Sequence, residues 1–421
     1  MKKSKQNCLN TNVFHCIIKN RKMGKFKTGI RNFCVLVFAV VSLCHASATE
    51  TQTVFDKIIQ NVVNQQLSTA DIDYEDGQTS QYLSTLRPDG SFPDIDYKST
   101  SQVSWAPYKH LSRLRSMAIS YISPKSEYYG DEALHKTIIN MLNYWYDSNP
   151  KSTNWFWQEV SWPQIMGVDL CLLRVGKDPV PQDLESKILK RMRDISKGPD
   201  QPGSQGSAAN KMDIALQWIY RSTLQADKET LDFSVDQLYY PLRFNTGEGL
   251  QSDYSYLQHG RQLYIGVYGE AVLEAVLNAA FSLTGTEYER GEEMGLVSDF
   301  LRNAYIPAVR GRLMMYNAVG RSMACIGGTN RTSFPSILED MKKLDPEYSD
   351  IYDAAIKRVS GKESASYGLE PYHRLFWRAD YTLHQRPEYT IDVRMATIRT
   401  KRCENGNQEN LKGYFLTEGG T

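Results

Sequence analysis

The sequence has few of the residues that mark special classes of protein. Its 421 residues include only 7 Cys, 16 Pro and 28 Gly, and the 49 Lys and Arg nearly balance the 48 Asp and Glu. This composition excludes a collagen-like repeat, a disordered polyelectrolyte and a polytopic membrane protein. After residue 48, no stretch offers about 18 uninterrupted apolar residues, so we expect no membrane span. The length is sufficient for a large apolar core.

The charge balance hides an uneven distribution. Residues 1–48 contain nine Lys or Arg and no Asp or Glu, which leaves 40 basic against 48 acidic residues, a net charge of −8, for the rest of the chain. A nucleic-acid-binding protein usually carries a basic excess, so that class is excluded. A polyanionic ligand would have to meet a local group of basic side chains instead.

The amino-terminal segment has the pattern of a secretory signal. Lys and Arg lie between residues 25 and 31, an apolar stretch covers residues 33–43, and Ala46-Ser47-Ala48 supplies small residues for cleavage. We therefore expect residues 1–22 to be an over-long start and residues 23–48 to be a signal peptide. The mature protein is then exported, to the periplasm or the extracellular space.

Three cysteines remain after that leader, namely Cys171, Cys325 and Cys403. They are too far apart in the sequence for a disulfide framework or for a metal-ligand pattern. Cys171 lies in an apolar helical run, where we expect it to be buried in the core.

Helical periodicity dominates from about residue 53 to residue 359, in segments separated by loops rich in Gly, Pro, Ser and Asn. The pattern predicts a mainly α fold with an all-α core region. The clearest predicted helices cover residues 105–122, 131–146, 163–175, 182–195, 210–224, 267–283 and 350–359.

The pattern changes after Glu370-Pro371. Residues 389–400 alternate apolar and polar side chains, which predicts a strand. The chain stops at Thr421, too soon for a stable sheet domain of its own. We therefore expect an amino-terminal piece of something longer, with a helical domain at residues 49–365 and the beginning of a β domain at residues 366–421.

The first candidate site is aromatic. Three of the seven Trp fall in residues 154–162, just before Pro163, which is typical of the first turn of a helix, so we expect the cluster to lie on a loop. Flat rings beside Asn154 suit a sugar. Aromatic packing beneath a long loop explains the cluster equally well.

Two further segments carry polar groups at the starts of predicted helices. Residues 206–210 form a small-residue loop that brings the Asn210 amide and helix-end N–H groups close to a ligand carboxylate, although Asn210 is also suited to an N-cap or first-turn role. Residues 249–260, which include His259, lead to Tyr268 at the start of an apolar helix. The helix dipole and a nearby Arg321 would lower the pKa of Tyr268. Taken alone, His259 and Tyr268 are more typical of ordinary loop residues.

The last candidate is a charge pair. Gly320-Arg321 and the run Asn407-Gln408-Glu409-Asn410 supply opposite charges that would orient such a site. Taken singly, each is more typical of a solvated surface side chain.

Together these segments make the chain recognisable. It resembles the polysaccharide lyase family that contains chondroitin AC lyase, hyaluronate lyase and xanthan lyase, and the chondroitin AC lyases most of all, from about Thr85 to the last residue. The motifs that carry the resemblance are Tyr144-Trp145-Tyr146-Asp147-Ser148, Asn154-Trp155, Ala209-Asn210-Lys211, Asp253 to Gly260, Tyr268-Gly269, Glu370-Pro371-Tyr372-His373 and Glu409-Asn410-Leu411.

The resemblance implies a fold and an activity. The fold is an incomplete α/α toroid of helical hairpins, followed by antiparallel β-sandwich domains of which this chain holds only the truncated start. The activity is β-elimination on an acidic polysaccharide, chondroitin sulfate or hyaluronan, which leaves an unsaturated uronide. We expect a glycosaminoglycan substrate, no cofactor, no metal and a monomer.

The resemblance also implies roles for individual residues. Asn210 matches the asparagine that neutralises the uronic acid carboxylate, His259 the catalytic histidine, and Tyr268 the tyrosine that removes the C5 proton. Arg321 matches an arginine beside that tyrosine, and Glu409 a glutamate that orients the group. The aromatic patch that holds the sugars is matched by Asn154, Trp155 and Phe156, with Trp157 following.

The sequence departs from the family pattern at one notable position. Cys325 stands where the family has a second arginine, four residues after Arg321. Two rival functions remain, and the first of them follows from this departure and from the expected truncation. One is a non-catalytic glycosaminoglycan-binding protein or inactive lyase fragment. The other is an inverting glycosidase on a helical toroid that uses two carboxylates such as Glu159 and Asp253.

Overall fold

The structure, a computed structural model, describes residues 54–395, 397–401 and 403–413. The predicted over-long start and signal peptide lie outside these residues. A helix through residues 54–69 leads into the numbered helices of the amino-terminal part. These are α2 (Ile72–Thr85), α3 (Tyr108–Ile122), α4 (Glu132–Ser148), α5 (Trp162–Arg174), α6 (Gln182–Ile195), α7 (Ala208–Gln225) and α8 (Lys228–Tyr239).

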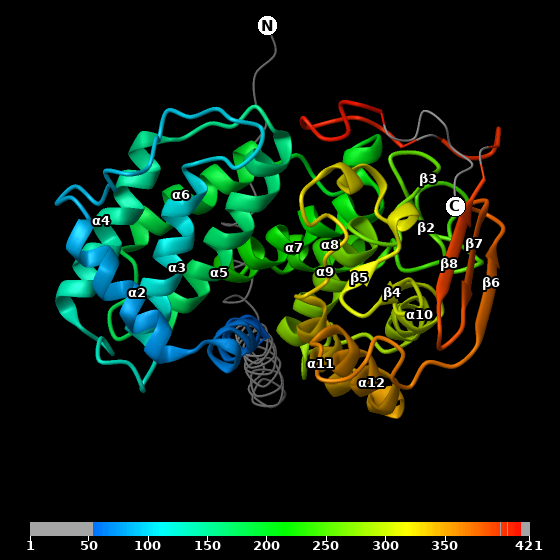
Figure 1. Ribbon diagram of the computed structural model, residues 1–421. Helices are drawn as coiled ribbons and strands as arrows, with labels where there is room; N and C mark the ends of the chain where they lie inside the picture. Colours follow the sequence, from blue (N-terminus) through cyan, green and yellow to red (C-terminus); the bar gives the residue numbers. More distant parts are fainter. Residues whose placement is uncertain (1–53, 396, 402, 414–421) are drawn as a thin grey trace, which may run out of the picture. The chain divides into compact units, whose positions relative to one another are not determined.

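Four helices complete the helical region: α9 (Tyr268–Leu283), α10 (Glu292–Phe300), α11 (Phe334–Leu344) and α12 (Ser349–Val359). Helix pairs pack as hairpins, α2 with α3, α7 with α8 and α11 with α12. Alternate helices also contact each other, α3 with α5, α5 with α7 and α7 with α9, so these four helices follow one another through the helical region (Figure 1). This double arrangement confirms the mainly α prediction, with helical hairpins as its unit.

Helix α7 belongs to this series of four helices. Its side chains are buried on almost every side, from Ala208 to Leu224, since α5, α8 and α9 all pack against it. Burial on almost every side, of polar as well as apolar residues, places this helix inside the helical region. The amino-terminal end of α7 is therefore held firmly, and polar side chains in its first turns keep a constant position.

The helical region is not all-α, which corrects the prediction for residues 53–359. Three short strands, β1 (Gly249–Leu250), β2 (Tyr256–Gln258) and β3 (Gln262–Leu263), make a small antiparallel sheet. A second sheet pairs β4 (Val309–Arg310) with β5 (Leu313–Met314). Strands of two or three residues are too short to show an alternating pattern, so the sequence carried no signal for them.

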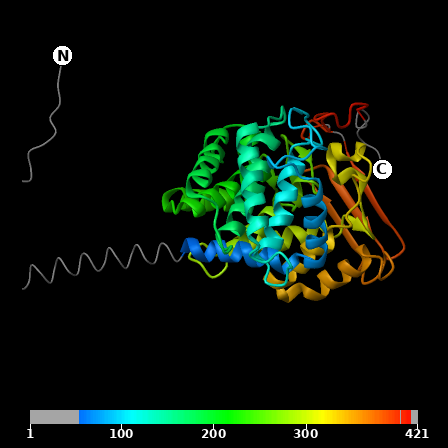
Figure 2. The same ribbon diagram turned by 90° about the vertical axis from the view of Figure 1, so that its left-hand side faces the viewer.

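A three-stranded antiparallel sheet follows the helices: β6 (Tyr372–Phe376), β7 (Tyr381–Gln385) and β8 (Thr390–Arg394), in that order. The predicted strand at residues 389–400 therefore ends sooner than expected. In both views the sheet lies at one edge of the helical region (Figures 1 and 2). In the described part of the chain, no helix combines the length and the apolar character needed to cross a membrane.

Side chains of the helical region hold this sheet in place. Arg310 donates to the carbonyl oxygens of Arg386 and Pro387, in the turn between β7 and β8. Asn317 donates to the Asp392 carboxylate at 3.2 Å. The segment after β8, coloured red in Figure 1, then runs back across the helical region, where Lys401 N donates to the carbonyl of Arg261 at 3.0 Å.

Candidate active site

One cavity, of about 390 Å³, collects most of the predicted site residues. Its walls come from segments that are far apart in the sequence: the start of the aromatic helix, α7, the β2–β3 turn, α9, the segment at Arg321 and the segment after β8. The predicted residues that line it are Asn154, Trp155, Phe156, Asn210, His259, Tyr268 and Arg321. Glu409 and Trp157 do not line it.

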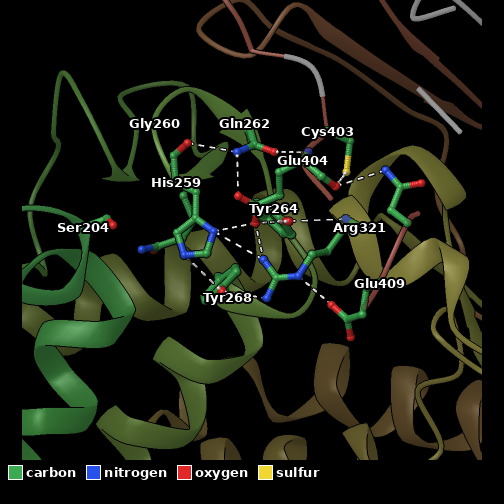
Figure 3. Close-up of polar contacts among 12 residues, drawn as sticks. Ser204, His259, Gly260, Gln262, Tyr264, Tyr268, Arg321, Cys403, Glu404 and Glu409 are labelled. Atoms are coloured by element: carbon green, nitrogen blue, oxygen red, sulfur yellow. Dashed lines mark hydrogen bonds and ion pairs between the residues drawn. The ribbon is translucent and has the colours of Figure 1, made fainter. Parts of the chain in front are cut away.

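His259 and Tyr268 both line this cavity and contact each other there (Figure 3). His259 occupies the turn between β2 and β3 with a left-handed φ of 54°, and Tyr268 is the first residue of α9. The Tyr268 hydroxyl lies 3.2 Å from His259 Nε2. A hydroxyl and an imidazole at this distance are able to exchange a proton.

Arg321 joins the pair from a short 3₁₀ helix, Gly320–Ala324. Its Nη2 lies 3.3 Å from the Tyr268 hydroxyl, and its Nε lies 2.5 Å from Glu409 Oε2 (Figure 3). Gly320 makes this approach feasible, because its φ is 55° and an added Cβ would come within 1.9 Å of the Tyr264 ring. The predicted charge pair therefore forms, and it brings a cation to the phenol.

Glu404, which was not predicted from the sequence, also lines the cavity. Its Oε1 lies 2.5 Å from His259 Nδ1, and the same carboxylate makes an ion pair with Arg321 (Figure 3). Burial by itself would raise the pKa of Glu404, but the hydrogen bond from His259, together with the positive charge of Arg321, brings that pKa down to about 2. Glu404 thus stays ionised beside the imidazole.

Glu404 also decides which imidazole nitrogen carries the proton. Because Nδ1 faces a carboxylate, the proton is assigned to Nδ1, and the lone pair of Nε2 points to the Tyr268 hydroxyl. Glu409 touches neither ring. It contacts Arg321 and accepts a hydrogen bond from the Cys325 thiol at 3.3 Å. Glu404 lies in an irregular stretch outside the motif that drew attention to Glu409, so no local pattern distinguished it.

The expected direction of the Tyr268 pKa shift was wrong. The structure raises that pKa, because burial of the hydroxyl outweighs the opposite effect of Arg321. A neutral phenol is therefore the resting form, and it needs a partner that takes its proton. His259 Nε2, 3.2 Å from the hydroxyl, is placed to accept that proton.

Asn210 is in the first turn of α7 and is almost fully buried, with Ser207 at the N-cap position instead. Its Nδ2 donates to the carbonyl of Ser204 at 2.9 Å, which fixes the amide at the cavity wall. The amide nitrogen carries two hydrogens, so one remains for a ligand. Asp213 lines the same wall one turn later, and burial, with a smaller effect of Glu274, raises its pKa to about 7.

The aromatic cluster is not on a loop, which corrects that prediction. Trp155 and Phe156 begin a helix that continues as a π-helical turn, Trp157–Ser161, into α5. A π turn widens the helix just before Pro163, whose ring would clash with an ordinary preceding turn. The rings of Trp155 and Phe156 lie edge to face in the cavity wall, with their centroids 5.7 Å apart.

Trp157 points elsewhere. Its ring packs against the Tyr108 ring, with the two centroids 4.9 Å apart, and its Nε1 donates to the carbonyl of Gln102. Trp157 is therefore half-buried and packs against the core. The sugar-binding interpretation fits Trp155 and Phe156, and the packing interpretation fits Trp157. Neither Glu159 nor Asp253 lines the cavity, and the Asp253 carboxylate accepts hydrogen bonds from the backbone N–H groups of Ser255 and Arg378.

Among the described residues, no group of three or more His, Cys, Asp or Glu is placed to hold a metal ion.

Comparison with known proteins places this geometry in a family. Residues 50–358 match "Polysaccharide lyase family 8, N terminal alpha-helical domain", and residues 371–421 match "Polysaccharide lyase family 8, super-sandwich domain". Chondroitinase-AC of Pedobacter heparinus is 38% identical over 392 residues, which are 92% of this chain and 54% of that protein. A hyaluronate lyase of Thermasporomyces composti is 23% identical and covers 82% of this chain and 48% of its own length.

Solved structures agree. A chondroitinase AC lyase structure superposes with a TM-score of 0.81 at 37% identity, over 88% of this chain and 53% of that one. The Streptomyces coelicolor A3 chondroitin AC lyase gives a TM-score of 0.69 at 19% identity, over 86% of this chain and 56% of that one, which shows a shared fold. The chain spans about half the length of these relatives. The match over most of its residues shows that the chain belongs to polysaccharide lyase family 8.

Proposed function

We propose that this protein is an exported polysaccharide lyase that cleaves chondroitin sulfate or hyaluronan by β-elimination. One observation carries the proposal: the Tyr268 hydroxyl meets both His259 Nε2 and Arg321 Nη2 at the wall of a cavity that Asn210 and two aromatic rings also line. The proteins with the names chondroitinase-AC and hyaluronate lyase among its relatives support the substrate class.

The reaction begins with a weak carbon acid. The C5 proton of a uronate lies next to an ionised carboxylate, and its removal builds a second negative charge onto that group. The free N–H of Asn210 donates to the carboxylate, which lowers the energy of the developing dianion. The indole of Trp155 and the ring of Phe156 hold the adjoining sugars against the wall.

Tyr268 then serves as base and acid in turn. His259 Nε2 takes the phenol proton, while Glu404 stabilises the imidazolium and Arg321 the phenolate. The phenolate removes the C5 proton, the C4–C5 double bond forms, and the bond from C4 to the glycosidic oxygen breaks. The new phenol gives its proton to the departing oxygen, and the imidazolium returns the first proton to Tyr268.

The test uses the protein encoded by the complete reading frame. We expect ultraviolet absorbance of the conjugated double bond to rise when it is incubated with chondroitin sulfate or hyaluronan. Absence of this signal with every uronide polymer contradicts the proposal. Binding without any change in polymer length would favour the glycan-binding rival, and reducing ends without the double bond would favour the glycosidase.

A further inference from the structure

Glu248, just before β1, lies outside the cavity that the site residues line, and yet it is bonded to two of the elements that form it. Its carboxylate accepts three hydrogen bonds. The donors are Gly260 N at 2.5 Å, Ser207 Oγ at 2.7 Å and Gln258 Nε2 at 3.1 Å. None of these residues has a role in the proposed chemistry, so the arrangement calls for another explanation.

Two of the donors stand on either side of His259 in the chain. The His259 backbone has a φ of 54°, a left-handed conformation that residues with a side chain rarely adopt and that persists only where the surroundings enforce it. Glu248 binds the residue before this position and the residue after it. The carboxylate thereby fixes the turn that aims the imidazole at Tyr268.

The third donor belongs to the helix that carries Asn210. Ser207 is the N-cap residue of α7, but its hydroxyl makes no capping bond inside the helix. The single hydrogen of that hydroxyl is shared between two acceptors, the Glu248 carboxylate at 2.7 Å and the Ser204 carbonyl at 3.1 Å. That carbonyl also accepts the hydrogen bond from Asn210 Nδ2. Glu248 is therefore linked to the Asn210 amide through Ser207 and Ser204.

A second connection runs in parallel. The Tyr256 hydroxyl accepts from Ala209 N at 3.0 Å and donates to Gln258 Oε1 at 3.4 Å. Tyr256 and Gln258 are both buried. A buried, connected polar network of this kind keeps one arrangement, because each broken bond leaves a polar group without a partner. Buried hydrogen bonds thus join the amino-terminal end of α7 to the His259 turn.

We propose that Glu248 is a positioning residue for the elimination, which holds the imidazole of His259 and the amide of Asn210 at a constant separation. This inference rests on the proposed function. The two groups act on different atoms of one sugar, His259 through Tyr268 and Asn210 on the carboxylate, and they come from separate elements. An error in their separation weakens transition-state contacts while the sugars remain bound by the aromatic wall.

Glu248→Gln tests the proposal. The amide keeps the size of the side chain but has one acceptor oxygen in place of two, and its NH2 would face N–H or O–H donors. We expect kcat to fall about 10- to 100-fold, as for a small misplacement of catalytic groups, and KM to change less than about twofold. Ser207→Ala removes only the direct bond from α7 to Glu248 and leaves the connection through Tyr256 intact, so we expect a smaller fall in kcat.

Asp345→Asn is the matched control. Asp345 is another carboxylate that accepts from two side-chain hydroxyls, those of Ser298 and Tyr352, but it is remote from the cavity wall. We expect this variant to lower Tm and to leave kcat unchanged. A Glu248→Gln enzyme whose kcat stays within twofold of wild type, or falls only as its folded fraction falls, overturns the proposal.

Hydrogen–deuterium exchange separates this proposal from the lyase activity itself. In Glu248→Gln we expect faster exchange in residues 207–212 and 256–263 together, with the other core helices unchanged. If the wild-type protein cleaves no polymer but this paired change appears, the proposed function fails and the coupling through Glu248 stands. Faster exchange in one segment alone, or throughout the core, contradicts the coupling.

Discussion

The helical region and the segment after β8 contribute to the site in opposite ways. Asn210 and Tyr268 occupy the first turns of long, buried helices, so their positions follow from the packing of the core. Glu404 and Glu409 come from residues 403–413, where regular structure is limited to an isolated bridge. The Asn210 amide and the Tyr268 hydroxyl thus lie on buried helices, whereas the two carboxylates lie on an irregular segment that contacts with the helical region hold in place.

Specific bonds hold that segment in place. Glu404 N donates to Gln262 Oε1 at 2.8 Å, beside the His259 turn, and Asn410 Nδ2 donates to the Glu404 carbonyl at 3.1 Å. An irregular segment that is bonded to a rigid scaffold is a common source of site residues, because the scaffold supplies the precision. The helical region supplies the cation beside Tyr268, Arg321, and the segment after β8 supplies the two carboxylates that pair with it, so neither region alone has the full set of charges.

The largest effect is expected in the helical region. Tyr268→Phe removes the hydroxyl that carries the proton, so we expect turnover to fall by about 10³-fold or more, while the affinity for an oligosaccharide changes little. Initial rates from ultraviolet absorbance and calorimetric titration measure the two quantities. A fast Tyr268→Phe enzyme would count against this assignment of the base.

The second prediction compares the two acids of the other region. Glu404 contacts both His259 and Arg321, whereas Glu409 contacts Arg321 but neither ring of the pair. We expect Glu404→Gln to lower kcat by about 10²-fold and Glu409→Gln by about 10-fold, since only the first change loses the group that orients the imidazole. Equal effects of the two variants, measured under the same conditions, would show that the contact with His259 has no special role.

The smallest effects concern pH and stability, and they have opposite signs in the two regions. Glu404 has a pKa of about 2 against an ordinary value of 4.5, so its stabilising contribution is complete above pH 4.5 and is lost as the pH falls toward 2. Asp213 has a pKa of about 7 against 3.8, so the folded state keeps a proton that the unfolded state releases, and stability falls as the pH rises from 3.8 to 7.

Two variants test these signs. Asp213→Asn is expected to raise Tm by about 2–4 °C at pH 7.5 and to have little effect at pH 4. Gln81→Asn, at an exposed position of α2, changes no titratable group and is the control, so any Tm difference that it causes should be the same at pH 4 and at pH 7.5. Glu404→Gln should reduce the loss of Tm on acidification below pH 4.5. A Tm difference for Asp213→Asn that is the same at all pH values would mean that this acid is ionised in the folded protein.

The helices were well predicted because their signal is local and repeated. The predicted range 182–195 coincides with α6, and Tyr268 begins α9 as expected from the apolar run that follows it. The small sheets of the helical region and the helical start of the aromatic cluster were not predicted. The strands are too short for a pattern, and the π turn before Pro163 depends on how that proline packs.

The pKa of Tyr268 shows a different limit. The cation and the helix end were visible in the sequence, but burial, which has the largest effect, was not. Burial is a property of all neighbours together, so a motif does not reveal it. The same limit applies to the aromatic run: Trp155 lines the cavity, whereas Trp157, two residues later, packs against the core.

The sequence by itself determined the helical periodicity, the change to β structure after residue 370 and the motifs of the family, because each depends on neighbours a few positions apart. Only the tertiary structure decided that Glu404 meets His259 and that Glu248 joins the turn of His259 to the helix of Asn210. These contacts span 145, 41 and 12 positions of the chain. The long-range ones exist only when the packed core brings distant segments together, so no local pattern records them.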